Sequence, residues 1–591
     1  FEKLLKSGNS ETLQQHAITV EFTTNPSWYA VQALPYLAEY PYECAEQIFN
    51  RYYANALASM IANSTPKLKA IFDQWKNADS TALLSNLQKN EELKSVLLEE
   101  TPWVLQAKNE AQQKKNIALL FDMVKMSGQL SSNFDKLRQM QTENGGFPWF
   151  KGGRDDRFIT QYIATGIGHL KKLNALPESQ KKGWTDLAKK SLTYLDQRIK
   201  EDYNNLVKSK AKLNQNNLSY SQIQYLYMRS FFTESGTAAA SLTAVSYYRK
   251  QAQQYWLMQN RYMQGMIALA LFRTGDPITA KKIIKSLKEN SITSEELGTY
   301  WKENSGGYYW HQAPVETQSL LIEAFAEIEK DAATTDDLKT WLLKQKQTQN
   351  WRTTKATADA CYALLATGSE WTTEAPEVQI KLGDKTISSA TEKQEAGTGY
   401  FKKIFTPPMV NPGMGDISVK ISTPSKTSLP SWGAVYWQYF ENLENITPAA
   451  TPLKLTKKLF IEKNSDRGPV LEPIQENAYL HIGDKIKVRI EIRVDRDMEY
   501  VHMKDMRASA LEPVNVLSGY KWQGGLGYYE STKDASTNFF FSWLAKGTYV
   551  FEYPLFVTHT GSFSNGVTSI QCMYAPEFAS HSEGIRINVE K

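Results

Sequence analysis

The sequence contains few cysteines, few histidines and no long apolar run. Its 591 residues include three cysteines, Cys44, Cys361 and Cys572, and seven histidines. Cysteines so few and so far apart do not form a disulfide framework, and without a Cys-x-x-Cys or histidine-rich pattern they do not indicate a zinc site. No stretch approaches the roughly 18 apolar residues of a membrane-spanning helix. We therefore expect no metal, no cofactor and no membrane span within these residues.

Positive and negative charges are nearly balanced. The formal net charge is +5, and Lys and Arg are scattered along the chain. Nucleic-acid binding usually needs a concentrated basic surface, so we expect no nucleic-acid partner. At roughly 150 residues per domain, the length suggests about four domains. The chain begins at Phe1, and we expect any signal peptide or lipid anchor of the full-length protein to precede that residue.

Residues 26–372 have the apolar spacing of α-helices. Apolar residues recur every three or four positions, and short segments with Gly, Pro or Asp separate these runs. The segment MIALALFRTGDPITAKKIIKSLKENS predicts one helix ending near Gly275 and another beginning near Pro277. Helical hairpins of this kind stack on their neighbours to bury their apolar faces. Stacked hairpins that close into a ring form an α/α toroid, although spacing alone does not establish closure.

Three segments of this region share a weakly repeated plan. In each, glycine or aromatic residues precede a threonine and then an apolar helix, and the threonines are Thr160, Thr317 and Thr357. A hydroxyl at a helix start accepts hydrogen bonds from backbone amides that lack a partner. We therefore expect these threonines to cap their helices.

After about residue 373 the apolar spacing changes to two, which is typical of strands. The segment DKIKVRIEIRV places five apolar side chains on one face and Lys and Arg on the other. ENITPAATPLK predicts a linker near 445–453, and AITVEFTT predicts a strand before the helices, as if a helical domain were inserted into a β domain. We predict a multidomain α + β protein with antiparallel β-sandwich domains. The predicted segments are 1–25, 26–372, 373–450 and 451–591.

The segment YPYECAEQIFNRYY places a cysteine and a glutamine three positions apart at a predicted helix start. Pro41 has no amide to leave unpaired, and Glu43 and Glu46 favour the positive end of a helix dipole. We expect the helix to begin just before Cys44, with Cys44 and Gln47 as neighbours on its surface. A thiolate is favoured at a helix N-terminus, and the nearest electrophile is the Gln47 carboxamide. Attack by sulfur with loss of ammonia would give an internal thioester.

The same spacing also fits a purely structural interpretation. In that interpretation Cys44 is a packed apolar residue and Gln47 is solvated. We expect Cys361 to be a buried, small apolar side chain.

The residues around this pair resemble the thioester motif of the α2-macroglobulin and complement family. The usual motif is Gly-Cys-Gly-Glu-Gln, and YPYECAEQ is similar to the bacterial form, Tyr-Pro-Tyr-Gly-Cys-x-Glu-Gln. The resemblance implies that Cys44 and Gln47 form the thioester, with Glu46 and Pro41 as supporting motif residues. Glu43 replaces a glycine of the commoner form, and its charge is expected to discourage a thiolate beside it.

The resemblance extends over nearly the whole chain. In the family the thioester domain is an α/α toroid inserted into a CUB-type β domain, which implies a toroid at 26–372 within a CUB-type domain made of 1–25 and 373–450. WLLKQKQTQNWRTTKATADACYALL resembles the closing signature of that toroid. Residues 451–591 resemble the C-terminal macroglobulin-like domain, which is called receptor-binding in vertebrates.

The resemblance implies a protease inhibitor with a single-use reactive group rather than an enzyme. In the family a protease cleaves a bait region upstream, and a lysine amine of that protease captures the acyl group of the glutamine while the cysteine leaves as a thiol. We expect covalent capture of target proteases here, by a monomer without a cofactor. Resemblance to bacterial members also implies export to the periplasm or cell surface, as a lipoprotein in the full-length protein.

A thioester survives only where water is excluded. In bacterial members a tyrosine before the motif and a methionine of the last domain shield it, which implies Tyr40 and Met573 here. Tyr42 and Tyr574 are alternatives for this role, and all four also fit ordinary packing. Complement members that prefer hydroxyl targets add a histidine, whose position would fall within residues 218–226. This segment contains no histidine, so direct transfer to amines is expected.

Two other functions stay open. An α/α toroid is also the architecture of some glycosidases, and Asp155, Asp156 and Glu316 lie where paired carboxylates of an inverting enzyme could sit. A noncovalent interaction protein, whose thioester is unformed or hydrolysed, is the second alternative. His311 could approach the site, but its Gly- and Tyr-rich surroundings fit a surface hydrogen bond better.

Overall fold

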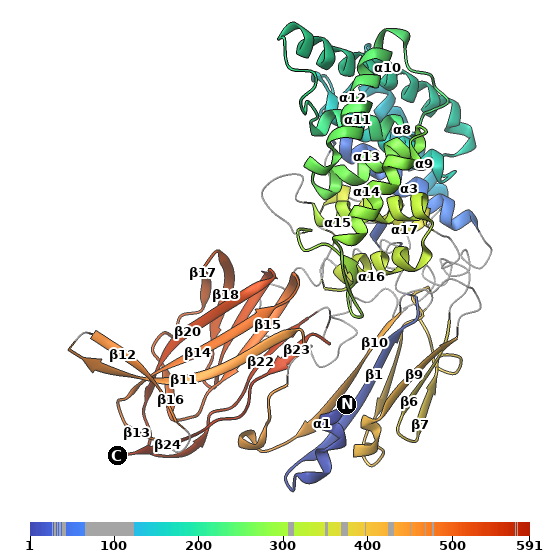
Figure 1. Ribbon diagram of the computed structural model, residues 1–591. Coiled ribbons are helices and arrows are strands. Elements are labelled where there is room, and N and C mark those ends of the chain that lie inside the picture. Colours follow the sequence, from blue (N-terminus) through green and yellow to red (C-terminus); the bar gives the residue numbers. More distant parts are fainter. Residues whose placement is uncertain are drawn as a thin grey trace.

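The chain folds into a helical domain and two β domains, as the computed structural model shows (Figure 1). The predicted combination of helices with several antiparallel sheets is confirmed. The structure describes residues 1–591 except 26, 27, 29, 30, 32, 35, 36, 38–42, 65–122, 305–312, 349, 350, 352, 368–375, 396, 423–430, 450, 467, 476, 477, 574 and 576.

The helical domain has inner and outer helices that alternate along the chain. The inner helices contact one another in the order α3, α9, α11, α13, α15 and α17, and α17 contacts α3 again. Among the described residues, this series of contacts is therefore closed. The inner helices are α3 (Ala45–Ser64), α9 (Arg157–Lys172), α11 (Tyr220–Arg229), α13 (Arg261–Arg273), α15 (Pro314–Ala324) and α17 (Thr354–Ala366). The outer helices are α8 (Met123–Met140), α10 (Lys181–Lys208), α12 (Leu242–Tyr255), α14 (Pro277–Glu289) and α16 (Ala332–Thr348).

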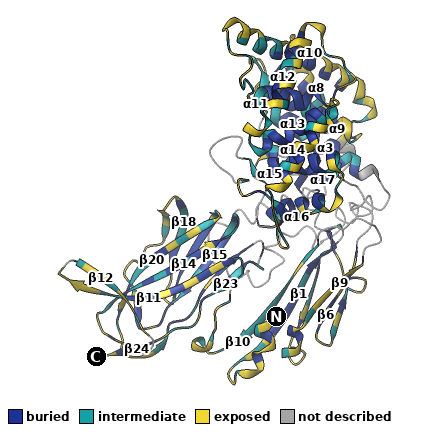
Figure 2. Cartoon of the chain, viewed as in Figure 1, coloured by how far each residue is buried: buried dark blue, intermediate teal, exposed yellow. Residues whose placement is uncertain are grey.

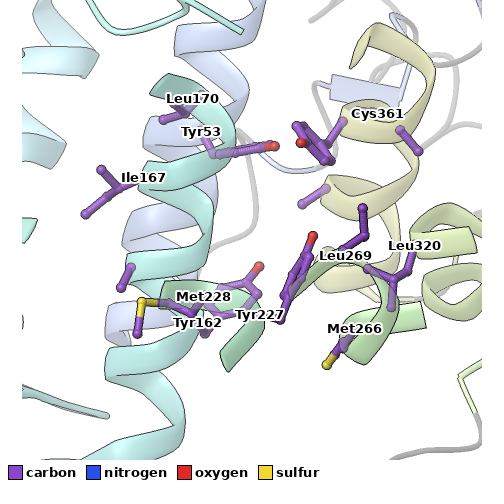
Figure 3. Packing of buried hydrophobic residues seen from close by; sticks show 14 of the residues in the cluster. Tyr53, Tyr162, Ile167, Leu170, Tyr227, Met228, Met266, Leu269, Leu320 and Cys361 are labelled. Carbon is purple, nitrogen blue, oxygen red and sulfur yellow. The ribbon is translucent and has the colours of Figure 1, made fainter. Parts of the chain in front are cut away.

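The two sets of helices differ in how much of their surface is buried (Figure 2). Outer helix α14 buries one stripe, Ala280, Ile283, Ile284 and Leu287, at the three- and four-residue spacing of an amphipathic helix. Inner helix α15 is buried at every position from 315 to 324. Side chains from all six inner helices, among them Tyr53, Tyr227 and Leu320, meet in the core between them (Figure 3).

The predicted helical hairpin near Gly275 is confirmed. Helix α13 ends at Arg273, and Gly275 then adopts a φ of 90°, a conformation that residues with a Cβ rarely accept. The Asp276 side chain accepts a hydrogen bond from the Thr279 amide at 3.0 Å. Pro277 occupies the first turn of α14, where its missing amide costs no hydrogen bond.

The expectation that three threonines cap their helices is wrong. The hydroxyls of Thr160, Thr317 and Thr357 each donate to the carbonyl four residues earlier, at 2.7–3.0 Å. Each of these helices begins about one turn before its threonine. The apolar spacing did not predict these starts, because the first residue of each helix is not part of the apolar pattern. Asp156 caps α9 through the Ile159 amide, and Thr353 caps α17 through the Ala356 amide.

The first β domain is assembled from both sides of the helical domain. Strand β1 (Gln14–Thr23) lies between β8 (Phe401–Phe405) and β10 (Trp432–Phe440) and pairs antiparallel with both. A second sheet has the order β7-β6-β9 and packs through the same apolar core. Its strands are β6 (Glu377–Leu382), β7 (Lys385–Ser388) and β9 (Ile417–Ser422).

The C-terminal β domain contains sheets of five, six and three strands. The five-stranded sheet has the order β12-β11-β14-β20-β16, the six-stranded sheet β17-β18-β19-β15-β22-β23, and the smaller sheet β13-β24-β21. The predicted apolar face of β14 is confirmed, since Ile486, Val488, Ile490, Ile492 and Val494 are all buried. The strands are β11 (Leu453–Ser465), β12 (Gly468–Pro473), β13 (Tyr479–His481), β14 (Lys485–Val494), β15 (Met498–Met506), β16 (Leu511–Pro513), β17 (Gly519–Gln523), β18 (Leu526–Thr532), β19 (Ser536–Leu544), β20 (Gly547–Val557), β21 (Gly561–Ser564), β22 (Thr568–Cys572), β23 (Ala579–His581) and β24 (Arg586–Glu590).

The C-terminal domain contacts both other domains. The Arg496 guanidinium pairs with Glu296 of the helical domain at 2.6 Å. The Tyr436 hydroxyl of β10 donates to Glu577 at 3.4 Å. Within the predicted linker, Ala449 forms a backbone bridge with His581 of β23. No helix among the described residues is both long and apolar enough to cross a bilayer.

Candidate functional site

Cys44 lies directly before helix α3. The helix begins at Ala45, one residue later than expected, and the Cys44 carbonyl accepts the hydrogen bond of the Ile48 amide at 3.0 Å. The Ala45 amide donates to the Trp149 carbonyl at 2.9 Å, which satisfies one of the unpaired amides of the first turn. Cysteine therefore occupies the flanking position where Ser, Thr, Asp or Asn usually lies, and its sulfur faces the backbone amides of the first turn.

The Cys44 side chain is only 8% exposed. Burial, the largest influence, raises the pKa of the thiol, and the charge of Glu46 raises it further. The backbone amides of Gln47 and Glu46 act in the opposite direction. Cys44 is thus a protonated thiol beside donors that would stabilise a negative sulfur during a reaction.

Gln47 is also buried, with 7% of its surface exposed, so the interpretation of Gln47 as a solvated residue is wrong. Its amide nitrogen donates to Glu46 Oε2 at 2.7 Å and to Thr354 Oγ1 at 3.0 Å. Its carbonyl oxygen is buried and has no hydrogen-bond partner among the described residues. The Gln47 carboxamide is therefore held through its nitrogen, and its carbonyl oxygen is unpaired among the described residues.

The neighbours of Gln47 form a connected cluster between α3 and α17. Thr354 Oγ1 donates to Glu46 Oε1 at 2.7 Å, and Asn50 Nδ2 donates to the same oxygen at 2.9 Å. The Tyr162 hydroxyl of α9 donates to Asn50 Oδ1 at 2.6 Å. The cluster therefore joins three inner helices around the Gln47 amide.

The charge of Glu43 is balanced by two cations. Its carboxylate pairs with Arg51 at 2.8 Å and with Lys136 at 3.0 Å, and its side chain is 58% exposed. Although partial burial opposes ionisation, hydrogen bonding and attraction to Lys136 and Arg51 lower the pKa of Glu43. This residue therefore belongs to the domain surface, where its charge is neutralised.

A cavity of about 40 Å³ lies between the inner helices, and Asn50 lines both this cavity and the Gln47 cluster. A cavity of this size has room for about three water molecules, although most of its lining surface is apolar. Lys355 in its wall pairs with Asp359 at 2.5 Å and donates to the Tyr262 hydroxyl at 2.9 Å. Glu316 is another wall residue.

The three acidic residues of the glycosidase alternative are not brought into one cavity. Asp156 caps α9, and Asp155 accepts a hydrogen bond from Asn144 at 3.2 Å. Among the described residues that line the cavity, Glu316 is present and the two aspartates are not. Within the same described ranges, no cluster of histidine, cysteine or acidic residues suits a metal ion.

Several predicted site residues lie outside the described residues. These are Tyr40, Pro41, Tyr42, Tyr574 and His311. Met573 is described and fully buried in the C-terminal domain, where its amide donates to the Tyr500 carbonyl at 2.9 Å.

Sequence reasoning missed Thr354, Asn50 and Trp149. Thr354 is 307 positions from Gln47, and no local pattern connects two residues so far apart. Asn50 lies one turn after Glu46, at a spacing where side chains meet, and that spacing was a usable signal. Trp149 belongs to the glycine- and aromatic-rich loop before α9, and its contact with α3 is a backbone hydrogen bond, which side-chain patterns do not indicate.

Comparison with known proteins identifies the C-terminal domain. Residues 453–577 match the family described as the bacterial alpha-2-macroglobulin MG10 domain. The domain is thus a macroglobulin-like β domain. The match covers this domain alone, and it agrees with the resemblance of the Cys44 motif to the same family. A search of curated protein sequences found no significant match.

Alignments with solved structures of bacterial alpha-2-macroglobulins cover most of this chain. A crystal structure of native Escherichia coli alpha-2-macroglobulin from domain MG7 to the C-terminus is 12% identical, with 98% of this chain and 78% of that chain covered and a TM-score of 0.35. The Escherichia coli protein activated by porcine elastase is 12% identical, with 98% and 44% covered and a TM-score of 0.42. Salmonella alpha-2-macroglobulin reacted with methylamine is 13% identical, with 98% and 32% covered and a TM-score of 0.34. Such TM-scores do not establish a shared arrangement, and this chain spans about a third of the Salmonella protein.

Proposed function

We propose that this chain is the C-terminal part of a bacterial α2-macroglobulin-like protease inhibitor, and that Cys44 and Gln47 form its reactive thioester. The closed series of inner-helix contacts supports an α/α toroid for the thioester domain. The pairing of β1 with β8 and β10 supports a CUB-type β domain into which this toroid is inserted. The MG10 match supports the third part of the assignment.

The observation that carries the proposal is the environment of the two side chains. Cys44 and Gln47 are buried together at the start of α3, which limits hydrolysis of an acyl group there. The amide nitrogen, which must leave, is held by Glu46 and Thr354. The sulfur, which must attack, faces backbone amides that favour negative charge.

The proposed reaction is a single acyl transfer. An amine of an attacking protease would bond to the Gln47 carbonyl carbon, and Cys44 would leave as a thiol. Cleavage of a bait upstream of residue 1 would trigger exposure, and Met573, Tyr40, Tyr42 and Tyr574 would keep water out before that event. The full-length protein would be an exported monomer held in the periplasm or at the cell surface as a lipoprotein.

Intact mass tests the thioester. Freshly purified protein should be lighter than its sequence by one ammonia, because thioester formation releases the Gln47 nitrogen. Methylamine should then add one methylamine per chain and release one thiol that can be titrated. Cys44→Ala should abolish both mass changes, whereas Cys361→Ala, which removes a thiol from the helical core, should leave both in place.

An unshifted mass in fresh wild-type protein would contradict the thioester and would favour the noncovalent alternative. Protease capture requires a further measurement on the full-length protein. Trypsin should become linked to the wild-type chain in a complex that survives denaturing electrophoresis, and Cys44→Ala should give none.

A further inference from the structure

The orientation of the Gln47 amide is set by the group that faces it. Glu46 Oε2 lies 2.7 Å from the amide nitrogen. A carboxylate only accepts hydrogen bonds, so the Gln47 atom that faces it must be the NH₂ group. Thr354 Oγ1 gives this nitrogen a second acceptor at 3.0 Å, from a different helix.

Glu46 is itself held in place. Thr354 and Asn50 donate to its other oxygen, Oε1, at 2.7 and 2.9 Å. The Tyr162 hydroxyl in turn fixes Asn50. Because Oε1 is occupied by two donors, Oε2 stays directed at the Gln47 nitrogen.

Forming a thioester requires a proton to move. The thiol must lose its proton to become a nucleophile, and the amide nitrogen must gain one to leave as ammonia rather than as an unstable amide anion. Burial raises the pKa of Cys44, so the thiol does not lose its proton unaided. A base is therefore needed. The Glu46 carboxylate contacts the leaving nitrogen directly, and its charge acts on the Cys44 sulfur.

We propose that Glu46 transfers the proton from Cys44 to the Gln47 nitrogen during thioester formation, with Thr354 as a positioning residue; this inference rests on the proposed function. The Sγ–H bond breaks, and Glu46 takes the proton. The Sγ–Cδ bond forms, and the Cδ–Nε2 bond breaks as Glu46 returns the proton to Nε2. Ammonia leaves, and Glu46 is again ionised, with no oxidation or reduction. When an amine attacks the thioester, Glu46 transfers a proton in the opposite direction. It takes a proton from the incoming nitrogen and gives a proton to the sulfur.

The rate of thioester re-formation tests this role. Ammonia opens the thioester and regenerates Gln47, so every variant starts in the amide form, and removal of ammonia starts the reaction. The fraction of chains lighter by one ammonia is then followed by intact mass. Glu46→Gln should slow re-formation by about 100-fold or more, the usual range for loss of a proton-transfer group. Glu43→Gln is the matched control, because it removes a surface carboxylate of the same segment, and it should re-form at the wild-type rate.

A purely structural role for Glu46 predicts a different result. Thr354→Val removes two hydrogen bonds between α3 and α17 but keeps the carboxylate, so re-formation should slow less than in Glu46→Gln. Equal slowing in Thr354→Val and Glu46→Gln, or a wild-type rate in Glu46→Gln, would overturn the proton-transfer role.

If Glu46→Gln does not fold, Glu46→Asp replaces it as the test. This variant moves the carboxylate back by one methylene and should also slow the reaction; a wild-type rate in Glu46→Asp would overturn the proton-transfer role. Wild-type protein that never loses ammonia would instead refute the thioester itself.

Discussion

At the scale of single residues, position decides which cysteine is suited to chemistry. Cys361 lies inside the helical core, where burial raises its pKa to about 12. The Cys572 thiol donates to the Glu499 carbonyl at 3.5 Å within the C-terminal domain. Cys44 combines burial with backbone amides directed at its sulfur, an arrangement that the helix start supplies.

Thiol labelling checks this distinction. In native, methylamine-treated protein, one thiol per chain should react with a disulfide reagent, and Cys44→Ala should remove that reaction. Because the pKa of Cys44 is raised, the labelling rate should reach its plateau at a higher pH than that of an ordinary thiol, whose pKa is about 8.5. Peptide mapping that places the label on Cys361 would contradict the assignment.

At the scale of helices, one carboxylate joins most of the inner ring. Glu323 of α15 pairs with Arg273 of α13 at 2.6 Å and with Lys172 of α9 at 3.0 Å. It also accepts from Tyr227 of α11 and Tyr362 of α17, both at 2.6 Å. Burial opposes ionisation of Glu323, but Arg273 and Lys172 hold its pKa well below the ordinary value. Five inner helices therefore depend on a single buried charge.

Glu323→Ala should destabilise the helical domain by about 2–3 kcal/mol, because two buried phenols lose their acceptor. The cost should stay below the roughly 3–5 kcal/mol of an unpaired buried charge, because Arg273 and Lys172 keep Glu327 as a partner. Urea unfolding followed by circular dichroism measures this loss. Since the folded pKa of Glu323 is lowered, its contribution is present above the ordinary glutamate pKa and is lost as pH falls through the folded value, so the difference should shrink in acid. Glu234→Ala removes an exposed ion pair with Lys171 and should cost less than about 1 kcal/mol.

The sequence predicted those features whose interacting residues are close together along the chain. The alternating face of β14 and the Gly275 hairpin were predictable, because neighbouring residues determine them. The Cys44–Gln47 pair was predictable for the same reason, as it lies within one helical turn. Contacts of Gln47 with Thr354 and of Glu323 with Arg273 join residues 307 and 50 positions apart, and no local spacing indicates them.

At the scale of the whole molecule, an ionisable group lies where the three domains meet. Glu577 of the C-terminal domain is close to Tyr436 and Glu21 of the first β domain and to Lys344 of α16. Burial, the largest influence, raises the pKa of Glu577 to about 7. Burial also lowers the pKa of Lys344, which is close to Glu577 and to the interdomain pair formed by Arg496 and Glu296.

Domain docking should consequently depend on pH. Because the folded pKa of Glu577 is raised from 4.5 to about 7, its stabilising effect is complete below 4.5 and is lost as pH rises through 7. Glu577 is partly exposed, so we expect a change on the order of 1 kcal/mol. Glu577→Gln should remove this dependence, as measured by the urea midpoint of the C-terminal domain between pH 5 and about 8. An unchanged pH profile in Glu577→Gln would contradict the role of this residue.

The central position of β1 has a mechanical consequence. This strand is hydrogen-bonded along both edges, to β8 and β10, and the chain that leaves its end passes through every helix from α3 to α17 before it returns to the same sheet (Figure 1). A force that pulled the helical domain away would act on two covalent connections in parallel and would load β1 in shear. Shear requires many backbone hydrogen bonds to break together, so the helical domain would tilt about this attachment long before it separated from the sheet.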